Sequence, residues 1–341
     1  MEYFGTFGPK CHTREQLKAV LEAGMTGIRL NLSHKNLEEC SEWLQAYQEA
    51  QQDLGMTGRL LIDLRGPELR LGDLEETVFL DKGQEIWLDI VRNEPKNPGA
   101  EVRTVEIPTI PVPKILGEYL QKGQNLLIND GMVRLEVTEE GPKVKGCILR
   151  GGEVASRKSI ALEGVEVPSP TLTPEDLENL KVAEFFQVTD VMLPFVRGKE
   201  DIQNLRQRLH ECGVEKIQIH AKIENKRGVE KLEEILDETD AVVIARGDLG
   251  QAYPLWELPV MQKEIAGKCR KKQIPFMVVT QMLQSMIKNP VPTRAEVMDI
   301  YNAVADGAAS LMLTGETAVG EYPEEAMKYL VKTAETAGKN L

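Results

Sequence analysis

The sequence has 341 residues, 42% of them hydrophobic, and a formal net charge of -13. This length supports a large core in one or two domains, and the negative charge argues against a nucleic acid or an anionic membrane as a partner. No secretory leader follows Met1, no apolar run is long enough to span a membrane, and the five cysteines are scattered without CxxC spacing, so we expect a reduced, cytoplasmic protein.

Three short apolar runs open the chain, at residues 3–8, 26–32 and 59–64. Helical signals lie between them: Thr13 and Gln16 have the spacing of a capping box, and the second helical segment extends to about Gly55. Strands that alternate with helices in this way predict a parallel sheet.

The pattern changes from about residue 69. Short alternating strands are predicted at residues 85–90, 125–128, 133–137 and 143–148. Gly and Pro separate them, and no long helical pattern intervenes. These features predict a small all-β, barrel-like lid domain over residues 69–167, inserted into the α/β domain.

The alternation of strands and helices resumes at Thr173, a good N-cap that precedes Pro174. Five further strands are predicted, at residues 188–193, 217–223, 240–245, 275–280 and 309–313. Three strands before the insert and five after it make eight, and segments 1–68 and 168–341 together have roughly the 250 residues typical of a TIM barrel. We therefore predict a (β/α)8 TIM barrel with an all-β domain inserted after strand 3; an open doubly wound sheet is the alternative.

Polar residues gather where the predicted barrel strands end, which is where TIM-barrel enzymes have their active sites. They are Arg29, Asn31, Asp63, Arg70, Lys222, Glu224, Arg246, Asp248, Thr280, Gln281, Thr314 and Glu316. The opposite strand ends show no comparable set. Lys222 and Glu224 are two residues apart at the end of one strand, so their side chains are expected on the same side, and the same is expected of Arg246 and Asp248.

Two carboxylates on adjacent strands, Glu224 and Asp248, suit an octahedral divalent cation, which prefers oxygen ligands and keeps positions open for substrate. Lys222 has three interpretations: a cation for a phosphoryl group or an oxyanion, a Schiff-base nucleophile, or a salt-bridge partner. The neighbouring metal favours the first. Further oxygen donors are Asn31, Ser33 and Asp63. On spacing alone, a hydrogen-bonded polar rim is a better interpretation of these donors than a monovalent cation site.

Several segments, in order along the chain, match one known family. They are Ile28–His34, Gly66–Arg70, Asn129–Gly131, Lys222–Asn225, Ala245–Gly250, Thr280–Leu283, Ser285–Ile287, Pro292–Glu296 and Gly315–Ala318. In these segments the chain resembles the pyruvate kinase family, over most of its length. The resemblance implies conversion of phosphoenolpyruvate and ADP to pyruvate and ATP in the cytoplasm, with Mg²⁺ (or Mn²⁺) and K⁺ as cofactors.

The resemblance also implies roles for individual residues. Lys222 would stabilise the transferred phosphoryl group, Thr280 would lie near the proton path to the enolate, and Arg29 would face a phosphate. The substrate carboxylate would be bound by the backbone of Gly247 and Asp248 and by Thr280, and Arg29 would also bind the substrate. Mg²⁺ would be held by Glu224 and Asp248. K⁺ would be held by Asn31, Ser33, Asp63 and the carbonyl of Leu64; Glu68 matches the K⁺-dependent members. The nucleotide would be bound by Arg70, Lys158, Asn31 and His34.

Some positions depart from the family pattern. The family usually has a C-terminal α/β domain with an effector site, and this sequence ends at Leu341. The resemblance therefore implies a short form without regulation through that domain, compatible with a homo-oligomer assembled through the barrel. Lys10 and Cys11 stand where the family usually has a small residue and serine. Lys35 replaces the usual glycine, and Val319 replaces the usual lysine. Segment 156–162 follows the family pattern only in part. The absence of lysine at position 319 and the partial match of segment 156–162 both affect the part of the site that the resemblance assigns to the nucleotide.

Two other functions remain open. One is a metal-dependent lyase or aldolase that stabilises a pyruvate enolate, and the other is a non-catalytic relative that binds a small acid. The non-catalytic relative is disfavoured by four intact residues, Lys222, Glu224, Asp248 and Thr280. Arg70 and Lys158 favour the kinase over the lyase, because a lyase has no phosphoryl group to hold.

Overall fold

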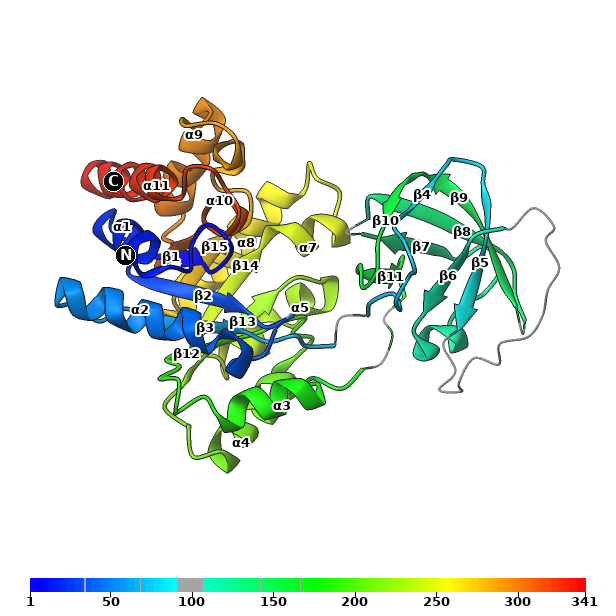
Figure 1. Ribbon diagram of the computed structural model, residues 1–341, viewed down its shortest axis with the longest axis horizontal. Coiled ribbons are helices and arrows are strands. Elements are labelled where there is room, and N and C mark those ends of the chain that lie inside the picture. The colour runs from blue at the N-terminus through cyan, green and yellow to red at the C-terminus, as the bar shows by residue number, and fades with distance from the viewer. Residues whose placement is uncertain are drawn as a thin grey trace. The chain divides into compact units, whose positions relative to one another are not determined.

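The computed structural model describes residues 1–33, 35–67, 69–90, 107–129, 131–141, 143–165, 167 and 169–341. The chain divides into two compact units, one formed by Met1–Pro67 with Pro170–Leu341 and the other by Glu68–Ser169 (Figure 1). Glu68, Glu166 and Pro168 lie outside the described residues. The exact domain boundaries, expected at residues 69 and 167, therefore stay a prediction.

The first unit is a closed barrel of eight parallel strands, which confirms the predicted (β/α)8 fold (Figure 1). Its strands are β1 (Glu2–Thr6), β2 (Gly27–Asn31), β3 (Arg59–Asp63), β12 (Asp190–Leu193), β13 (Gln218–Ile223), β14 (Ala241–Ala245), β15 (Phe276–Val279) and β16 (Ser310–Met312). The last strand, β16, pairs with β1 and closes the barrel, with Ser310 opposite Glu2. Closure thus places the last strand of the barrel beside the first.

The strands alternate with helices that surround the barrel. The helices are α1 (Arg14–Glu22), α2 (Ser41–Leu54), α3 (Pro174–Lys181), α4 (Lys199–Glu211), α5 (Lys226–Glu230), α6 (Leu232–Leu236), α7 (Arg246–Ala252), α8 (Leu258–Lys272), α9 (Arg294–Ala305), α10 (Gly315–Ala318) and α11 (Pro323–Asn340), with short 3-10 turns η1 (Glu38–Cys40) and η3 (Gln284–Ile287). Capping boxes at Thr13 and Thr293 start α1 and α9 as the sequence predicts. None of the helices that the structure describes is long and apolar enough to cross a membrane.

A compact apolar layer fills the middle of the barrel. It consists of Phe4, Leu61, Met192, Val243, Ala245, Met277, Val279 and Met312, all buried. A larger apolar cluster lies between the strands and the surrounding helices. Because side chains fill the interior, the barrel is no pore, and a ligand has access only to its two ends.

The second unit is an all-β domain inserted after the third barrel strand, as predicted. Its strands are β4 (Val78–Leu80), β5 (Glu85–Ile90), β6 (Thr109–Val112), β7 (Asn125–Ile128), β8 (Val133–Glu139), β9 (Val144–Arg150), β10 (Gly152–Val154) and β11 (Ile160–Leu162), with one 3-10 turn, η2 (Lys114–Glu118). They form a six-stranded sheet in the order β11-β7-β8-β9-β5-β6 and a two-stranded ribbon of β10 and β4. Alternate residues of β8, such as Val133, Leu135 and Val137, enter a core that belongs to this unit alone.

Candidate active site

Charged side chains from three strands meet inside the barrel at the carboxyl ends of the strands. Nζ of Lys222, on β13, lies 3.4 Å from Oδ1 of Asp63, on β3, and 2.9 Å from Oε1 of Glu224. Nε and Nη2 of Arg29, on β2, donate to Oδ2 of Asp63 at 2.9 and 2.5 Å. Two cations and two carboxylates thus form one cluster, which we call the charge cluster.

Electrostatics keep Lys222 and Asp63 ionised. Burial opposes the charge of Lys222, but Asp63 and Glu224 outweigh burial and raise the pKa of Lys222 above its usual value. Burial also opposes the charge of Asp63, and Lys222 and Arg29 outweigh it and lower the pKa of Asp63. A Schiff base requires a neutral amine, so this environment favours Lys222 as a fixed cation.

Glu224 and Asp63 each keep one oxygen suited to a further cation. Oε2 of Glu224 accepts a hydrogen bond of 2.8 Å from the Phe195 backbone N–H. Oε1 of Glu224 and Oδ1 of Asp63 are buried and accept no hydrogen bond from the described residues, although the Lys222 ammonium is near both. Buried carboxylate oxygens of this kind fit a metal ion, which prefers oxygen ligands.

The proposed K⁺ ligands also come together. Asn31 and Asp63 are opposite each other in the pairing of β2 with β3. Oδ1 of Asn31 accepts a hydrogen bond of 3.0 Å from the Ser33 backbone N–H, and Leu64 directly follows Asp63. These four residues therefore offer several oxygen atoms at adjacent strand ends. Within the described residues, no group of three or more His, Cys, Asp and Glu side chains could hold a metal ion.

The expectation that Arg246 and Asp248 point to the same side is wrong. Strand β14 ends at Ala245, and Arg246 is the first residue of α7, so the two residues follow the helical repeat of 3.6 and not the strand repeat of two. Asp248 accepts a hydrogen bond of 3.2 Å from Nε2 of Gln251 and lies near enough to Lys222 to contribute to its raised pKa. Arg246 turns away to Asp299 on α9.

Gly247 and Thr280 lie against each other at the ends of β14 and β15. A Cβ atom added to Gly247 would be 3.3 Å from Cγ2 and 3.8 Å from Oγ1 of Thr280. Gly247 is exposed and Asp248 is half-buried, so this segment is open to solvent. The two loops that the resemblance assigns to the substrate carboxylate are therefore neighbours.

The predicted nucleotide residues are divided between the two units. Within the inserted unit, Arg70 pairs with Ser159 in an isolated β-bridge, and the Leu71 backbone N–H donates to the carbonyl of Lys158 at 2.8 Å. Arg70 and Lys158 therefore lie on two paired segments. Asn31 belongs to the barrel. His34, Glu68 and Asp130 lie outside the described residues.

The expectation of no comparable polar set at the opposite strand ends is wrong. Asp190, which is fully buried, accepts hydrogen bonds there from Thr189 and from both Nε and Nη2 of Arg59. Nε2 of His220 lies 2.9 Å from Oδ1 of Asp190. Arg59 also reaches Glu2 at 3.1 Å. The sequence could have predicted this cluster, because the charged residues Glu2, Arg59 and Asp190 are the first residues of their strands.

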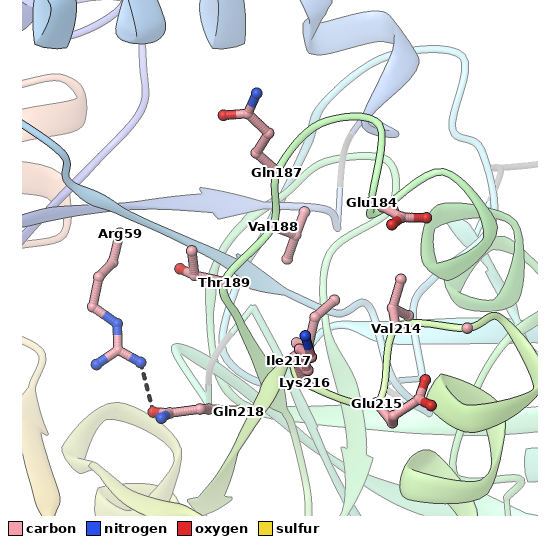
Figure 2. Close-up of a pocket in the computed structure, with 11 residues that line it drawn as sticks. Arg59, Glu184, Gln187, Val188, Thr189, Val214, Glu215, Lys216, Ile217 and Gln218 are labelled. Carbon is pink, nitrogen blue, oxygen red and sulfur yellow. Dashed lines mark hydrogen bonds between the residues drawn. The ribbon is translucent and has the colours of Figure 1, made fainter.

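A cavity of about 560 Å³ lies at this end of the barrel. Its lining includes Arg59, Thr189 and Gln218, at the amino ends of three strands (Figure 2). Nη2 of Arg59 donates to Oε1 of Gln218 at 2.6 Å (Figure 2). The charge cluster lies at the other end, and the cavity therefore does not belong to it.

Comparisons with known proteins agree with this architecture. The family model described as pyruvate kinase, barrel domain, matches residues 2–327. A pyruvate kinase from Thermotoga maritima is 36% identical over 98% of this chain and 70% of its own length. The enzyme of that name from Staphylococcus epidermidis is 36% identical over 97% of this chain, and that from Geobacillus stearothermophilus 34% identical over 96%. The chain spans 56% and 55% of the length of the latter two. On this evidence the chain belongs to the pyruvate kinase family.

Proposed function

We propose that the barrel transfers the phosphoryl group of phosphoenolpyruvate to ADP, giving pyruvate and ATP. The observation that carries the proposal is the charge cluster, in which the Lys222 ammonium lies 3.4 Å from Asp63 and 2.9 Å from Glu224. Phosphoryl transfer asks the protein mainly to position its substrates and to neutralise charge. Membership of the pyruvate kinase family supports the same reaction.

Each part of the site has a distinct proposed task. Lys222 balances the charge of the phosphoryl group while the bond to the enolate oxygen breaks and the bond to ADP forms. Mg²⁺ or Mn²⁺, held by Glu224 and Asp248, would neutralise substrate oxygens when bound. The backbone of Gly247 and the hydroxyl of Thr280 hold the carboxylate, and the enolate takes up a proton near Thr280. Arg29, Arg70, Lys158, Asn31 and His34 are proposed phosphate or nucleotide ligands.

The proposal is tested by a coupled assay of pyruvate formation from phosphoenolpyruvate. We expect turnover only with both ADP and Mg²⁺, and complete loss of turnover when EDTA removes the metal. Glu224→Gln should raise the Mg²⁺ concentration needed for half-maximal rate by about tenfold or more, because one metal ligand loses its charge. Glu230→Gln, on α5, is the matched control and should behave as the wild type.

The same assay separates the kinase from the lyase. A protein that releases pyruvate from a larger keto acid, and forms none from phosphoenolpyruvate and ADP, would contradict the proposed reaction. Binding of Mn²⁺, followed by electron paramagnetic resonance, gives a second readout that needs no turnover. Glu224→Gln should weaken this binding and Glu230→Gln should not.

Potassium dependence is a separate prediction. Asn31, Ser33, Asp63 and the Leu64 carbonyl supply the oxygen atoms for K⁺, and Asp63 has a buried oxygen that accepts no hydrogen bond from the described residues. We therefore expect K⁺ to raise the rate at fixed Mg²⁺ and fixed ionic strength. The control replaces K⁺ with tetramethylammonium, which is too large for the same ligands. Equal rates with the two cations would refute a K⁺ site.

A further inference from the structure

Arg246 is a charged residue of the barrel mouth to which the proposed reaction gives no task. Its guanidinium group joins three segments. Nε donates to the carbonyl of Val279 at 3.2 Å, and Nη2 donates to the carbonyl of Thr280 at 2.7 Å. Nη1 lies 2.8 and 2.7 Å from the two carboxylate oxygens of Asp299 on α9. One side chain thus ties the start of α7 to the end of β15 and to α9.

The segment that Arg246 holds, Thr280 and Gln281, has an unfavourable backbone conformation. Thr280 has φ of +74° and Gln281 has φ of +57°, so two consecutive residues other than glycine are in the left-handed region. This conformation is unusual for any residue with a Cβ atom and most unusual for a β-branched one such as Thr280. Such a backbone persists only where its surroundings hold it, and it is often found at functional sites.

A second contact holds the same loop from its other side. The carboxylate of Glu316, on α10, is fully buried and accepts a hydrogen bond of 3.0 Å from the Leu283 backbone N–H. It also accepts one of 2.8 Å from the Thr314 backbone N–H. The loop that begins at Thr280 is therefore fixed at the carbonyl of Thr280 by Arg246 and three residues later by Glu316.

We propose that Arg246, anchored by Asp299, is a positioning residue that sets Thr280 relative to Gly247 and Asp248. Gly247 directly follows Arg246 in the chain and lies against Thr280. The guanidinium group therefore fixes the spacing between the two loops assigned to the substrate carboxylate. The inference rests on the proposed function for the role of that spacing in substrate binding, and its geometry rests only on the contacts of Arg246 and Gly247 given above.

Lysine cannot take the place of arginine here. A guanidinium group is planar and presents several donors in a rigid fork, whereas an ammonium group is a single compact charge. In Arg246→Lys the ammonium can retain the ion pair with Asp299 or a carbonyl contact, but it cannot span both carbonyls and the carboxylate. The substitution thus keeps the charge and removes the positioning.

The test compares Arg246→Lys with Arg59→Lys. Arg59 also binds an aspartate carboxylate, in its case through Nε and Nη2, but at the opposite end of the barrel. We expect Arg246→Lys to lower kcat/KM for phosphoenolpyruvate by about 100-fold, because small misplacements near reacting atoms have effects of that size. KM for ADP should change less than about twofold. Arg59→Lys should lower the unfolding temperature and leave both kinetic parameters unchanged.

A double-mutant cycle distinguishes positioning through Thr280 from a general structural role. If Arg246 acts through Thr280, then Arg246→Lys should change kcat/KM by less than about twofold in a Thr280→Ala background. A loss of the same size in both backgrounds would overturn the inference. Wild-type kinetics in the single Arg246→Lys variant would overturn it as well.

Hydrogen exchange of segment 276–287, measured by mass spectrometry, gives a readout that is independent of turnover. Exchange should be faster in Arg246→Lys than in the wild type and in Arg59→Lys. An inactive wild-type protein would contradict the proposed function. In that case, faster exchange confined to Arg246→Lys still supports the positioning role, and equal exchange in all three proteins overturns it.

Discussion

Replacing Lys222 with Met should lower the rate of pyruvate formation by about 10³-fold or more, since removal of a group that neutralises transition-state charge has effects of this order. The side chain of Lys222 is only 14% exposed and lies beside the buried Asp63 and Glu224; these carboxylates outweigh its partial burial and raise its pKa. The ammonium therefore keeps its charge throughout the pH range of an ordinary assay. Methionine has a similar length and no charge, so the phosphoryl group would lose its cation.

The control for this substitution is Lys231→Met. Lys231 also pairs with a glutamate, Glu234, at 3.0 Å, but its side chain is 39% exposed and lies outside the charge cluster. Activity should be unchanged in this variant. Thermal unfolding of both variants, followed by circular dichroism, shows whether each is folded under the assay conditions. A folded Lys222→Met protein with more than about a tenth of the wild-type rate would remove Lys222 from the proposed mechanism.

The strand-end positions of Lys222 and Glu224 could be predicted from the sequence because local patterns encode them. A run of β-branched residues ending in charge indicates a buried strand, and the strand repeat of two sets the direction of each side chain. The ion pair of Lys222 with Asp63 could not be predicted in the same way. The two residues come from β13 and β3, with β12 between them in the barrel, so their contact depends on barrel closure.

The direction of the Arg246 side chain could not be predicted from local sequence patterns. The apolar run of β14 continues directly into Arg246 without a turn residue, so the strand repeat of two was extended past Ala245, where the strand ends. The partners of Arg246 lie on β15 and α9, 33 to 53 residues away in the chain. Hydrogen bonds to backbone carbonyls leave no trace in the identity of the residues that accept them. Such positioning contacts can therefore be found only in the folded structure.

The polar cluster around Asp190 was missed for a different reason. The polar residues that follow each apolar run indicated a functional site at the carboxyl ends of the strands. The polar residues that precede a run look like the exposed first residues of an ordinary strand. Counting back in steps of two from the interior residues Leu61 and Met192 reaches Arg59 and Asp190, which must then also face the interior. This signal was available, and it places an arginine and an aspartate on neighbouring strands.

Replacing Asp190 with Asn should lower the free energy of unfolding by about 3 kcal/mol at neutral pH, the lower part of the range for breaking a buried ion pair. Asp190 is fully buried and accepts hydrogen bonds from Arg59 and Thr189, with His220 Nε2 at 2.9 Å. Asparagine removes the charge that balances Arg59. The decrease in the free energy of unfolding should stay near the lower end of that range, because Arg59 is partly exposed to water and also pairs with Glu2.

The effect of Asp190→Asn should also depend on pH in a defined direction. Burial opposes the charge of Asp190, but His220, Arg59 and Thr189 outweigh burial and lower the pKa of its carboxyl group. The stabilisation is therefore complete above about pH 4, the usual value for aspartate, and is lost as the pH falls through the lower pKa of the folded state. Urea unfolding between pH 7 and pH 3 should show the variant and the wild type converging at the acid end.

The control is Asp53→Asn, because Asp53 also accepts two hydrogen bonds from one arginine, Arg14, but at the surface. Exposed ion pairs contribute little to stability, so this variant should unfold close to the wild type at every pH. A constant difference between Asp190→Asn and the wild type from pH 7 to pH 3 would contradict the ionic origin of the stabilisation. The cluster would then act through packing and neutral hydrogen bonds, which do not depend on the charge of Asp190.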